Sequence, residues 1–157
     1  MFKKIRPLIF KFSPEVAHSL AIKTLKSNLI PSSKAIDSTI LKTKLYGKNI
    51  KNPIGVAAGF DKNAEVYNPL FKLGFGFVEV GTITPNPQYG NPKPRVFRLE
   101  EDKALINRLG FNNSGSDEIS ARIKKNSAHG LLGINIGPNK DTKNRIEDYL
   151  KCFRKFY

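Results

Sequence analysis

The fold is decided by residues 52–62, which read Asn52-Pro53-Ile54-Gly55-Val56-Ala57-Ala58-Gly59-Phe60-Asp61-Lys62. The apolar run from Ile54 to Ala58 predicts a fully buried strand. Gly59 then allows the backbone to turn tightly or to approach a ligand closely. Asp61 and Lys62 follow the strand's carboxyl end, where α/β sheets and barrels bind ligands. These residues predict a strand-end site for an anionic or electron-accepting ligand, and a tight turn with a solvated ion pair is an equally good interpretation.

The strand pattern returns twice further along the chain. It occurs in Glu79-Val80-Gly81-Thr82-Ile83-Thr84-Pro85 and again in Gly133-Ile134-Asn135-Ile136-Gly137, where the buried strand carries one amide. We expect strands over 53–58, 76–82 and 131–136, with helices over 64–73, from a cap at Ser116, and from about Arg145 to the end. This strand–helix alternation predicts a parallel sheet.

The connecting segments have turn and loop signals of their own. Gly47 stands at the tip of an expected hairpin over 45–50. Residues 85–94 hold four prolines and predict a long loop, of the kind that is often functional. Residues 95–99 have the composition of an extra strand.

Two short amphipathic helices are expected before residue 30. Phe2, Ile5, Leu8, Ile9 and Phe12 recur at helical spacing, and Pro7 predicts that this helix begins near it or breaks there. Ser13, Pro14 and Glu15 are typical of a helix start. The expected apolar stripe of the second helix is Val16, Ala17, Leu20, Ala21 and Leu25, and residues 28–33 end that helix. Both stripes fit a membrane surface or a protein body equally well.

Composition narrows the class of protein. The chain has 39% hydrophobic residues, including eleven Phe, which is enough for a real hydrophobic core. Its length of 157 residues suggests one domain. The single Cys152 excludes a disulfide framework and suits a reducing cytoplasm. No stretch approaches the roughly 20 apolar residues of a membrane span. His18, His129 and Cys152 are isolated from one another, so no metal site is expected.

The charge is strongly basic. The net charge is +14, and residues 1–51 carry eleven basic and two acidic side chains, or +9. Nucleic acid and an anionic membrane are both partners for such a field. Solvated surface charge is an equally good explanation of the overall excess. It is a weaker explanation for the N-terminal segment, where charge and apolar periodicity coincide.

Together, in this order and spacing, these segments and Asn107-Arg108-Leu109-Gly110-Phe111 resemble dihydroorotate dehydrogenase, in particular its quinone-linked, membrane-associated class. The resemblance covers essentially the whole chain. It implies the N-terminal portion of a (β/α)₈ TIM barrel, about three βα units long, because a full barrel needs about 250 residues. The two helices would form a membrane- and quinone-associated extension over 1–30, with the FMN-binding barrel portion over 31–157.

The resemblance also assigns roles to residues. It implies cofactor contacts at Ala58, Gly59, Phe60, Asp61, Lys62, Thr82 and Asn135, and contacts with dihydroorotate or orotate at Lys62, Asn107, Arg108, Leu109, Gly110 and Phe111. His18 and Arg98 match positions that line the quinone entrance. Without the resemblance, the residues themselves favour plainer roles, such as a strand cap for Thr82 and an ordinary partly buried side chain for His18.

The implied function is oxidation of dihydroorotate to orotate in pyrimidine synthesis, with FMN as cofactor and a membrane quinone as acceptor. The implied location is the cytoplasmic face of the inner membrane, with no nucleic-acid partner. The family's catalytic serine would lie beyond Tyr157, so no catalytic base is assigned here, and we expect residues 1–157 alone to be inactive.

Three alternatives stay open. A flavin barrel acting on tRNA, such as a dihydrouridine synthase, would use the +14 charge. A half-barrel without catalytic activity would bind membrane or a partner chain. The cytosolic class of the same enzyme lacks the extension that residues 1–40 resemble.

Overall fold

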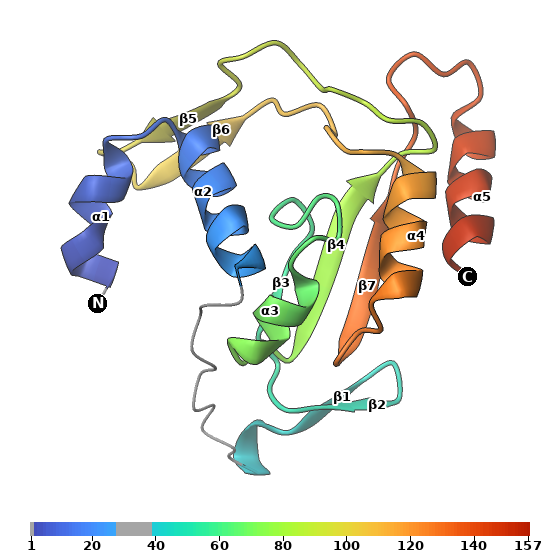
Figure 1. The fold of residues 1–157 in the computed structure, drawn as a ribbon, viewed down its shortest axis with the longest axis horizontal. Helices are drawn as coiled ribbons and strands as arrows, with labels where there is room; N and C mark the ends of the chain where they lie inside the picture. Colours follow the sequence, from blue (N-terminus) through green and yellow to red (C-terminus); the bar gives the residue numbers. More distant parts are fainter. Residues whose placement is uncertain (1, 28–38) are drawn as a thin grey trace.

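The computed structural model describes residues 2–27 and 39–157 and is organised around a three-stranded parallel sheet. The sheet consists of β3 (Gly55–Val56), β4 (Phe77–Ile83) and β7 (Leu131–Ile136), in the order β3-β4-β7. Helices α3 (Tyr67–Lys72) and α4 (Ser116–Lys125) lie on one face of the sheet (Figure 1). This confirms the predicted parallel sheet, and β7 has the predicted bounds.

Alternation along β4 separates its two faces. Val78 pairs with Leu132 and Val80 with Ile134, and these side chains belong to the hydrophobic core and its margin. Glu79 pairs with Gly133 on the opposite face. Beyond Val80 the register shifts, because the next pair joins Ile83 to Ile136 and leaves one extra residue on β4.

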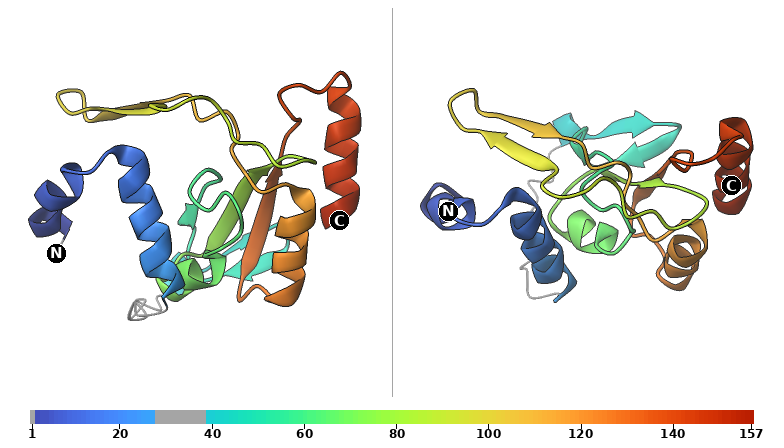
Figure 2. Two further views of the ribbon diagram at one scale, coloured as in Figure 1. Left: turned by 45° about the horizontal axis from the view of Figure 1, so that its top comes forward. Right: turned by 90° about the horizontal axis from the view of Figure 1, so that it is seen from above.

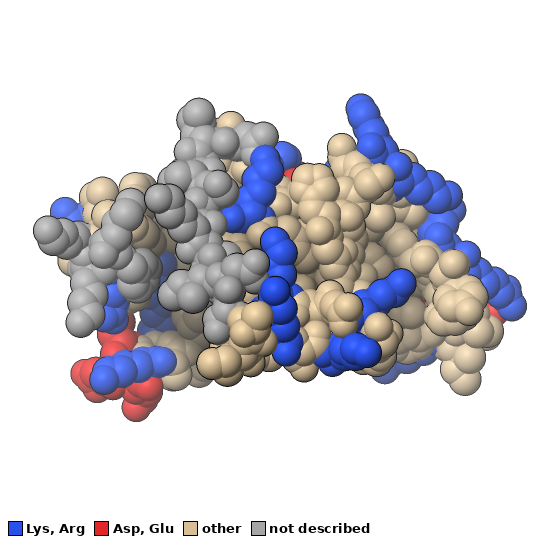
Figure 3. All heavy atoms as spheres, turned by 90° about the horizontal axis from the view of Figure 1, so that it is seen from below, with Lys and Arg blue, Asp and Glu red and all other residues tan. Residues whose placement is uncertain are grey.

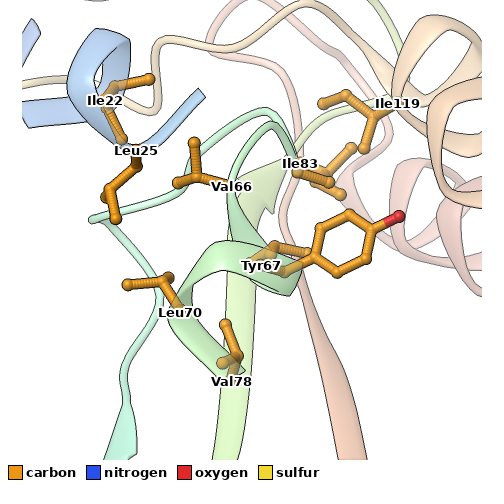
Figure 4. Close-up of a cluster of buried hydrophobic side chains, with 10 residues drawn as sticks. Ile22, Leu25, Val66, Tyr67, Leu70, Val78, Ile83 and Ile119 are labelled. Carbon is orange, nitrogen blue, oxygen red and sulfur yellow. The ribbon is translucent and has the colours of Figure 1, made fainter. Parts of the chain in front are cut away.

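The core fills the space between the sheet and its helices (Figure 4). Val66, Val78, Val80 and Ile83 are fully buried, as is Ile119 from α4. The other buried members are Ile22, Leu25, Ala64, Tyr67 and Leu70. Since two of these come from the second N-terminal helix, that helix packs on the same core as the sheet.

The first strand is shorter than its apolar run predicts. Ile54 is 65% exposed rather than buried. The Asn52 side chain explains this, because it accepts from the Ile54 N–H at 3.0 Å and donates to the Gly74 carbonyl at 2.9 Å. Gly76 donates from its N–H to the Ile54 carbonyl, at a position where a Cβ would collide with the Asn52 carbonyl. The segment is therefore held against the α3–β4 connection, and only Gly55 and Val56 join the ladder.

Helix α3 also begins later than the expected residue 64. Ala64 adopts a left-handed φ of 52°, which a helix interior does not allow. The Asp61 carboxylate accepts from the N–H groups of Glu65 and Val66, each at 2.7 Å, and so organises the turn before the helix.

The N-terminal helices are α1 (Phe2–Phe10) and α2 (Pro14–Lys26). The expectation for Pro7 is wrong, because α1 continues through it with the loss of one backbone hydrogen bond. The stripe expected on α2 is wrong in part. Leu25 is buried, but Ile22 is its buried companion, while Val16 and Leu20 are 47% and 44% exposed. Tertiary packing selects a face that includes His18 and Ile22. The expected helix end at 28–33 and the boundary between residues 30 and 31 lie outside the described residues.

Two hairpins complete the strands. The predicted one joins β1 (Thr43–Leu45) to β2 (Lys48–Ile50), after the short η1 (Thr39–Leu41), with Tyr46 and Gly47 at positive φ in its turn. The other pairs β5 (Val96–Leu99) with β6 (Ala104–Asn107), and it extends above α1 and α2 (Figure 2). Only its first strand is expected from the sequence.

The last helix, α5 (Arg145–Phe156), begins at the predicted residue and packs against α4 and β7. Asn144 caps it by accepting from the Glu147 N–H at 3.1 Å. Helix α4 is capped by Gly115 rather than Ser116, which takes the first helical position. The face in Figure 3 shows Lys and Arg spread over the surface, whereas acidic side chains gather mainly at one corner. Among the described residues no helix is long and apolar enough to cross a bilayer.

Candidate active site

The loop that follows β3 is tied to the carboxyl end of β4. The Gly59 N–H donates to the Gly81 carbonyl at 2.8 Å, and the Gly81 N–H donates to the Asp61 carbonyl at 3.1 Å. Gly59 has a φ of 105°, and a Cβ built on it would meet open space. The loop therefore presents bare backbone at the strand ends, as the sequence predicts.

Asp61 serves the fold through both carboxylate oxygens. It is 1% exposed and accepts the two N–H groups before α3. Burial raises the pKa of this carboxyl, while the backbone N–H donors act in the opposite direction. The solvated ion pair with Lys62 that the sequence left open is not present. A cofactor contact of Asp61 stays a prediction.

Lys62 points its ammonium back to the loop that precedes it. Its Nζ donates to the Gly59 carbonyl at 2.6 Å. Burial lowers the pKa of the Lys62 amine, and Glu15 counteracts this most among its charged neighbours. A half-buried amine beside open glycine backbone suits an anionic ligand, because the ligand's charge would replace the lost hydration.

A cleft of about 610 Å³ opens between α2, the β3–α3 loop and the β5–β6 hairpin. It brings together eight of the predicted site residues from four separate segments. They are His18, Gly59, Phe60, Asp61, Lys62, Arg98, Asn107 and Leu109. The cleft has the size of a small-molecule site. Its wall from α2 and the hairpin combines apolar side chains, such as Ile22 and Leu105, with charged and polar ones.

His18 is fixed by Phe60. Its Nε2 lies 2.7 Å from the Phe60 carbonyl, and the two rings meet edge to face with centroids 5.3 Å apart. Because a carbonyl only accepts, Nε2 carries the hydrogen. Burial lowers the pKa of His18, so the ring is neutral near pH 7 and its Nδ1 is a bare acceptor.

Arg98 holds the junction of the two N-terminal helices. Its guanidinium donates to the Phe12 carbonyl at 2.8 Å and lies 4.5 Å from the centroid of the Phe10 ring. It also lines the cleft. The side chain can therefore position α1 and α2 and face a ligand in the cleft.

Thr82 and Asn135 do not line this cleft but occupy the sheet face opposite the core. The Thr82 hydroxyl donates to Asn135 Oδ1 at 2.7 Å, and Asn135 Nδ2 donates to Glu79 Oε1 at 2.9 Å. Glycines adjoin this row. A Cβ on Gly137 would stand 2.7 Å from the Thr82 methyl, and one on Gly81 would collide with the Asn135 carbonyl. Near the carboxyl ends of the strands this face is therefore lined by polar side chains and glycines.

The Asn107–Phe111 segment is divided between cleft and surface. Arg108 donates to the Pro94 carbonyl at 3.2 Å, and Phe111 is 52% exposed. Gly110 has a φ of 74° and lies close to Asn91, with its carbonyl accepting from Gln88 at 2.9 Å. Arg108, Gly110, Phe111 and Ala58 therefore do not line the cleft.

Three residues near the site have no assignment from the sequence. Arg95 is buried and pairs with Glu15 of α2 at 2.6 Å. Asn113 is buried and donates to the Thr84 hydroxyl at 2.8 Å, which ties the segment between β6 and α4 to the end of β4. Asn112 lines the cleft, and its buried Oδ1 has no hydrogen-bond partner among the residues that the structure describes. In the sequence, only the pair of adjacent asparagines at 112 and 113, after the hairpin, could have indicated that these amides have a role.

The parallel strands, the glycine loop at their carboxyl ends and the cleft above it are the N-terminal portion of an α/β barrel with a strand-end site. The sequence model of the dihydroorotate dehydrogenase family matches residues 40–157. The chain belongs to this family.

Similar proteins agree in sequence and in fold. The chain is 50% identical over 157 residues to a dihydroorotate dehydrogenase (quinone) of Rhizobium johnstonii, covering 99% of this chain and 43% of that protein. It is 56% identical over 149 residues to that of Rhizobium meliloti, covering 95% and 41%. A crystal structure of dihydroorotate dehydrogenase from Eimeria tenella in complex with ferulenol matches 92% of this chain and 41% of its own length, with 44% identity and a TM-score of 0.86. The chain thus spans less than half the length of these relatives.

Proposed function

We propose that the natural polypeptide containing these residues oxidises dihydroorotate to orotate, with FMN as cofactor and a membrane quinone as electron acceptor. One observation carries the proposal. A single cleft places the candidate substrate ligands Lys62 and Asn107 beside the candidate acceptor ligands His18 and Arg98. A two-substrate redox reaction requires such proximity, and the named relatives are quinone-linked dehydrogenases.

The residues present fit FMN. A flat ring needs surfaces without protruding side chains, which the open backbone at Gly59 and the glycines beside Thr82 and Asn135 supply. Bound FMN would accept the hydride that leaves dihydroorotate. Lys62 would hold positive charge near the site, which stabilises added negative charge. Thr82 and Asn135 would offer acceptor and donor groups to the polar edge of the ring.

Lys62 and Asn107 support substrate binding. Dihydroorotate carries a carboxylate and a ring with amide groups. The Lys62 ammonium suits the carboxylate, and the Asn107 amide can both donate to and accept from the ring. Asn107 is exposed to the cleft, so its amide is accessible.

His18 supports an acceptor site on the α2 side of the cleft. Its Nδ1 is free to accept a hydrogen bond, because Nε2–H is engaged by the Phe60 carbonyl. A quinol hydroxyl is a suitable donor. Arg98 would face the quinone from β5 while it holds α1 and α2 in place.

Peripheral association with an anionic membrane at the cytoplasmic face is part of the proposal. The described N-terminal segment exposes large apolar side chains, with exposed fractions between 42% and 61%. They are Ile5, Leu8, Phe12, Val16 and Leu20. Exposed Arg6, Lys11 and Lys23 lie among them, and this combination suits an interfacial helix pair. A membrane-dissolved quinone would then reach the cleft from that side.

The proton-abstracting serine of the family would lie beyond Tyr157. We therefore propose that residues 1–157 alone do not oxidise dihydroorotate and bind FMN weakly. The polypeptide made by its own cells is the correct material for the test. Its intact mass, bound FMN and dihydroorotate-dependent quinone reduction are measured together. FMN with quinone reduction supports the proposal, whereas a flavin-free protein, or salt-sensitive tRNA binding without dihydroorotate oxidation, overturns it.

A second candidate is a half-barrel that acts with a partner chain. Helix α5 favours it, because an apolar stripe at helical spacing is 40–73% exposed. The stripe consists of Ile146, Tyr149, Leu150 and Phe153. A native mass near 17.6 kDa with a co-purifying chain supports this candidate, and a mass about twice that, on one chain, overturns it.

A further inference from the structure

We infer that Glu79 is a positioning residue for the FMN site, acting through Asn135. The inference deepens the proposed function and rests on it. Its basis is the hydrogen-bonded row on the sheet face opposite the core, from Thr82 through Asn135 to Glu79. All three side chains are partly buried there.

The row fixes the orientation of the Asn135 amide. An isolated amide can rotate by half a turn and exchange its donor and acceptor ends. An ionised carboxylate only accepts, so Glu79 Oε1, at 2.9 Å, requires the NH₂ end of Asn135 to point toward it. The Thr82 hydroxyl donates to the carbonyl end at 2.7 Å and completes the selection.

This selection determines what a ligand meets. With one N–H on Glu79, Asn135 has a second N–H left to donate. With its hydrogen on Asn135, the Thr82 oxygen keeps its lone pairs and can only accept. Thr82 and Asn135 thus present one acceptor and one donor, a pattern that the N–H and carbonyl groups of the isoalloxazine edge can match.

The backbone leaves room for Glu79 to reach Asn135. Glu79 stands opposite Gly133 in the register, and a Cβ on that glycine would lie 3.5 Å from the Glu79 Cγ. The Glu79 side chain can therefore extend along β7 over Gly133 toward Asn135.

The test is FMN affinity of the natural polypeptide, measured by quenching of flavin fluorescence. Glu79→Leu removes the acceptor at similar volume, and we expect FMN affinity to fall about tenfold, since a hydrogen bond to a charged group is lost. Glu79→Gln keeps an oxygen acceptor and should retain affinity within about threefold. Glu118→Gln, on the exposed start of α4, is the matched control and should have no effect.

A double-mutant cycle separates positioning from folding. In an Asn135→Ala background, Glu79→Leu should have no further effect on FMN affinity, because its route to the ligand is gone. An undiminished effect in that background overturns the inference. If Glu79→Leu does not fold, Glu79→Asp takes its place. The shorter Asp side chain holds its carboxylate about 1.5 Å farther from Asn135. If the unmodified polypeptide binds no FMN, the proposed function fails instead, so the two failures are distinguishable.

Discussion

Arg95, the residue before β5, pairs with Glu15 of α2 and so joins two parts of the chain that lie 80 residues apart. The Arg95 Nη2 donates to Glu15 Oε1 at 2.6 Å, and its Nε donates to the same carboxylate at 3.1 Å. The remaining nitrogen, Nη1, donates to the Tyr89 and Asn91 carbonyls at 2.6 and 3.0 Å. One guanidinium therefore fixes α2 and the long proline-rich loop to the hairpin, and the walls of the cleft depend on it.

The first prediction concerns this ion pair. Glu15→Gln leaves the buried Arg95 charge without a carboxylate, and we expect the free energy of unfolding to fall by about 2–4 kcal/mol. Urea unfolding followed by circular dichroism measures it. Glu118→Gln removes a more exposed carboxylate paired with Arg122 and should cost under about 1 kcal/mol. Equal losses in the two variants would contradict the buried role of Arg95.

The second prediction concerns pH. The folded state lowers the pKa of His18 below its ordinary 6.5, so the unfolded chain binds the proton more readily. The neutral His18 ring contributes fully to the free energy of unfolding above about pH 6.5. This contribution is lost as the pH falls through the lower pKa of the folded state. Between pH 7.5 and pH 5, the free energy of unfolding should decrease less for His18→Phe than for the unmodified chain. The exposed His129 supplies the control, His129→Gln, whose decrease should match that of the unmodified chain.

The Glu15 carboxyl has a separate acid window. Arg95 lowers the pKa of Glu15 below the ordinary 4.5. The stabilisation that the ionised Glu15 provides is therefore complete above about pH 4.5 and is lost as the pH falls through the lower pKa of the folded state. The His18 comparison between pH 7.5 and pH 5 is therefore free of it. Below about pH 4.5, the free energy of unfolding should therefore fall less for Glu15→Gln than for the unmodified chain.

The third prediction concerns Lys62. In the natural polypeptide, Lys62→Met should lower kcat/KM for dihydroorotate about 100-fold, because the proposed charge-assisted contact with the substrate carboxylate would be lost. Steady-state quinone reduction measures it. Lys124→Met, on the exposed end of α4, serves as control and should leave kcat/KM within about twofold. An unchanged value for Lys62→Met would remove Lys62 from the site.

The fourth prediction concerns the membrane. Leu8→Glu should weaken binding to vesicles that contain anionic phospholipid by about tenfold, because one leucine no longer leaves water. Sedimentation with vesicles measures the bound fraction. Ile40 is 91% exposed but lies outside the helix pair, so Ile40→Glu should leave binding unchanged. If both substitutions weaken binding equally, α1 is not the contact surface.

Local patterns predicted the elements whose determinants are local. Strand β7 has the predicted bounds, β4 is displaced by one residue, and α5 starts at the predicted residue, capped by Asn144. Apolar runs, caps and glycines decide these elements within a few residues of sequence. The glycine loop at the carboxyl end of β3 was predictable for the same reason.

Several features leave no clear pattern in the sequence, whether their partners are near or distant, and were not predicted. Strand β6 reads Ala-Leu-Ile-Asn, which has no alternation of apolar and polar residues, and it is a strand because β5 pairs with it. Nothing near Glu15 signals Arg95. Asp61 was expected as a charge beside the cofactor, whereas its capping of the turn before α3 could have been recognised from an aspartate shortly before a helix.

The extra residue in β4 after Val80 has a consequence for which side chains can share one strand. With strict alternation, position 82 would face the core beside Val78 and Val80, and position 83 would face the opposite side. The bulge reverses this, so Ile83 is buried and Thr82 lies beside Asn135. A single inserted backbone unit thus lets the strand change phase near its end, so that Ile83 joins the core while its neighbour Thr82 joins the polar row with Asn135. If the same residues were paired in strict alternation instead, the last two side chains of the strand would exchange faces.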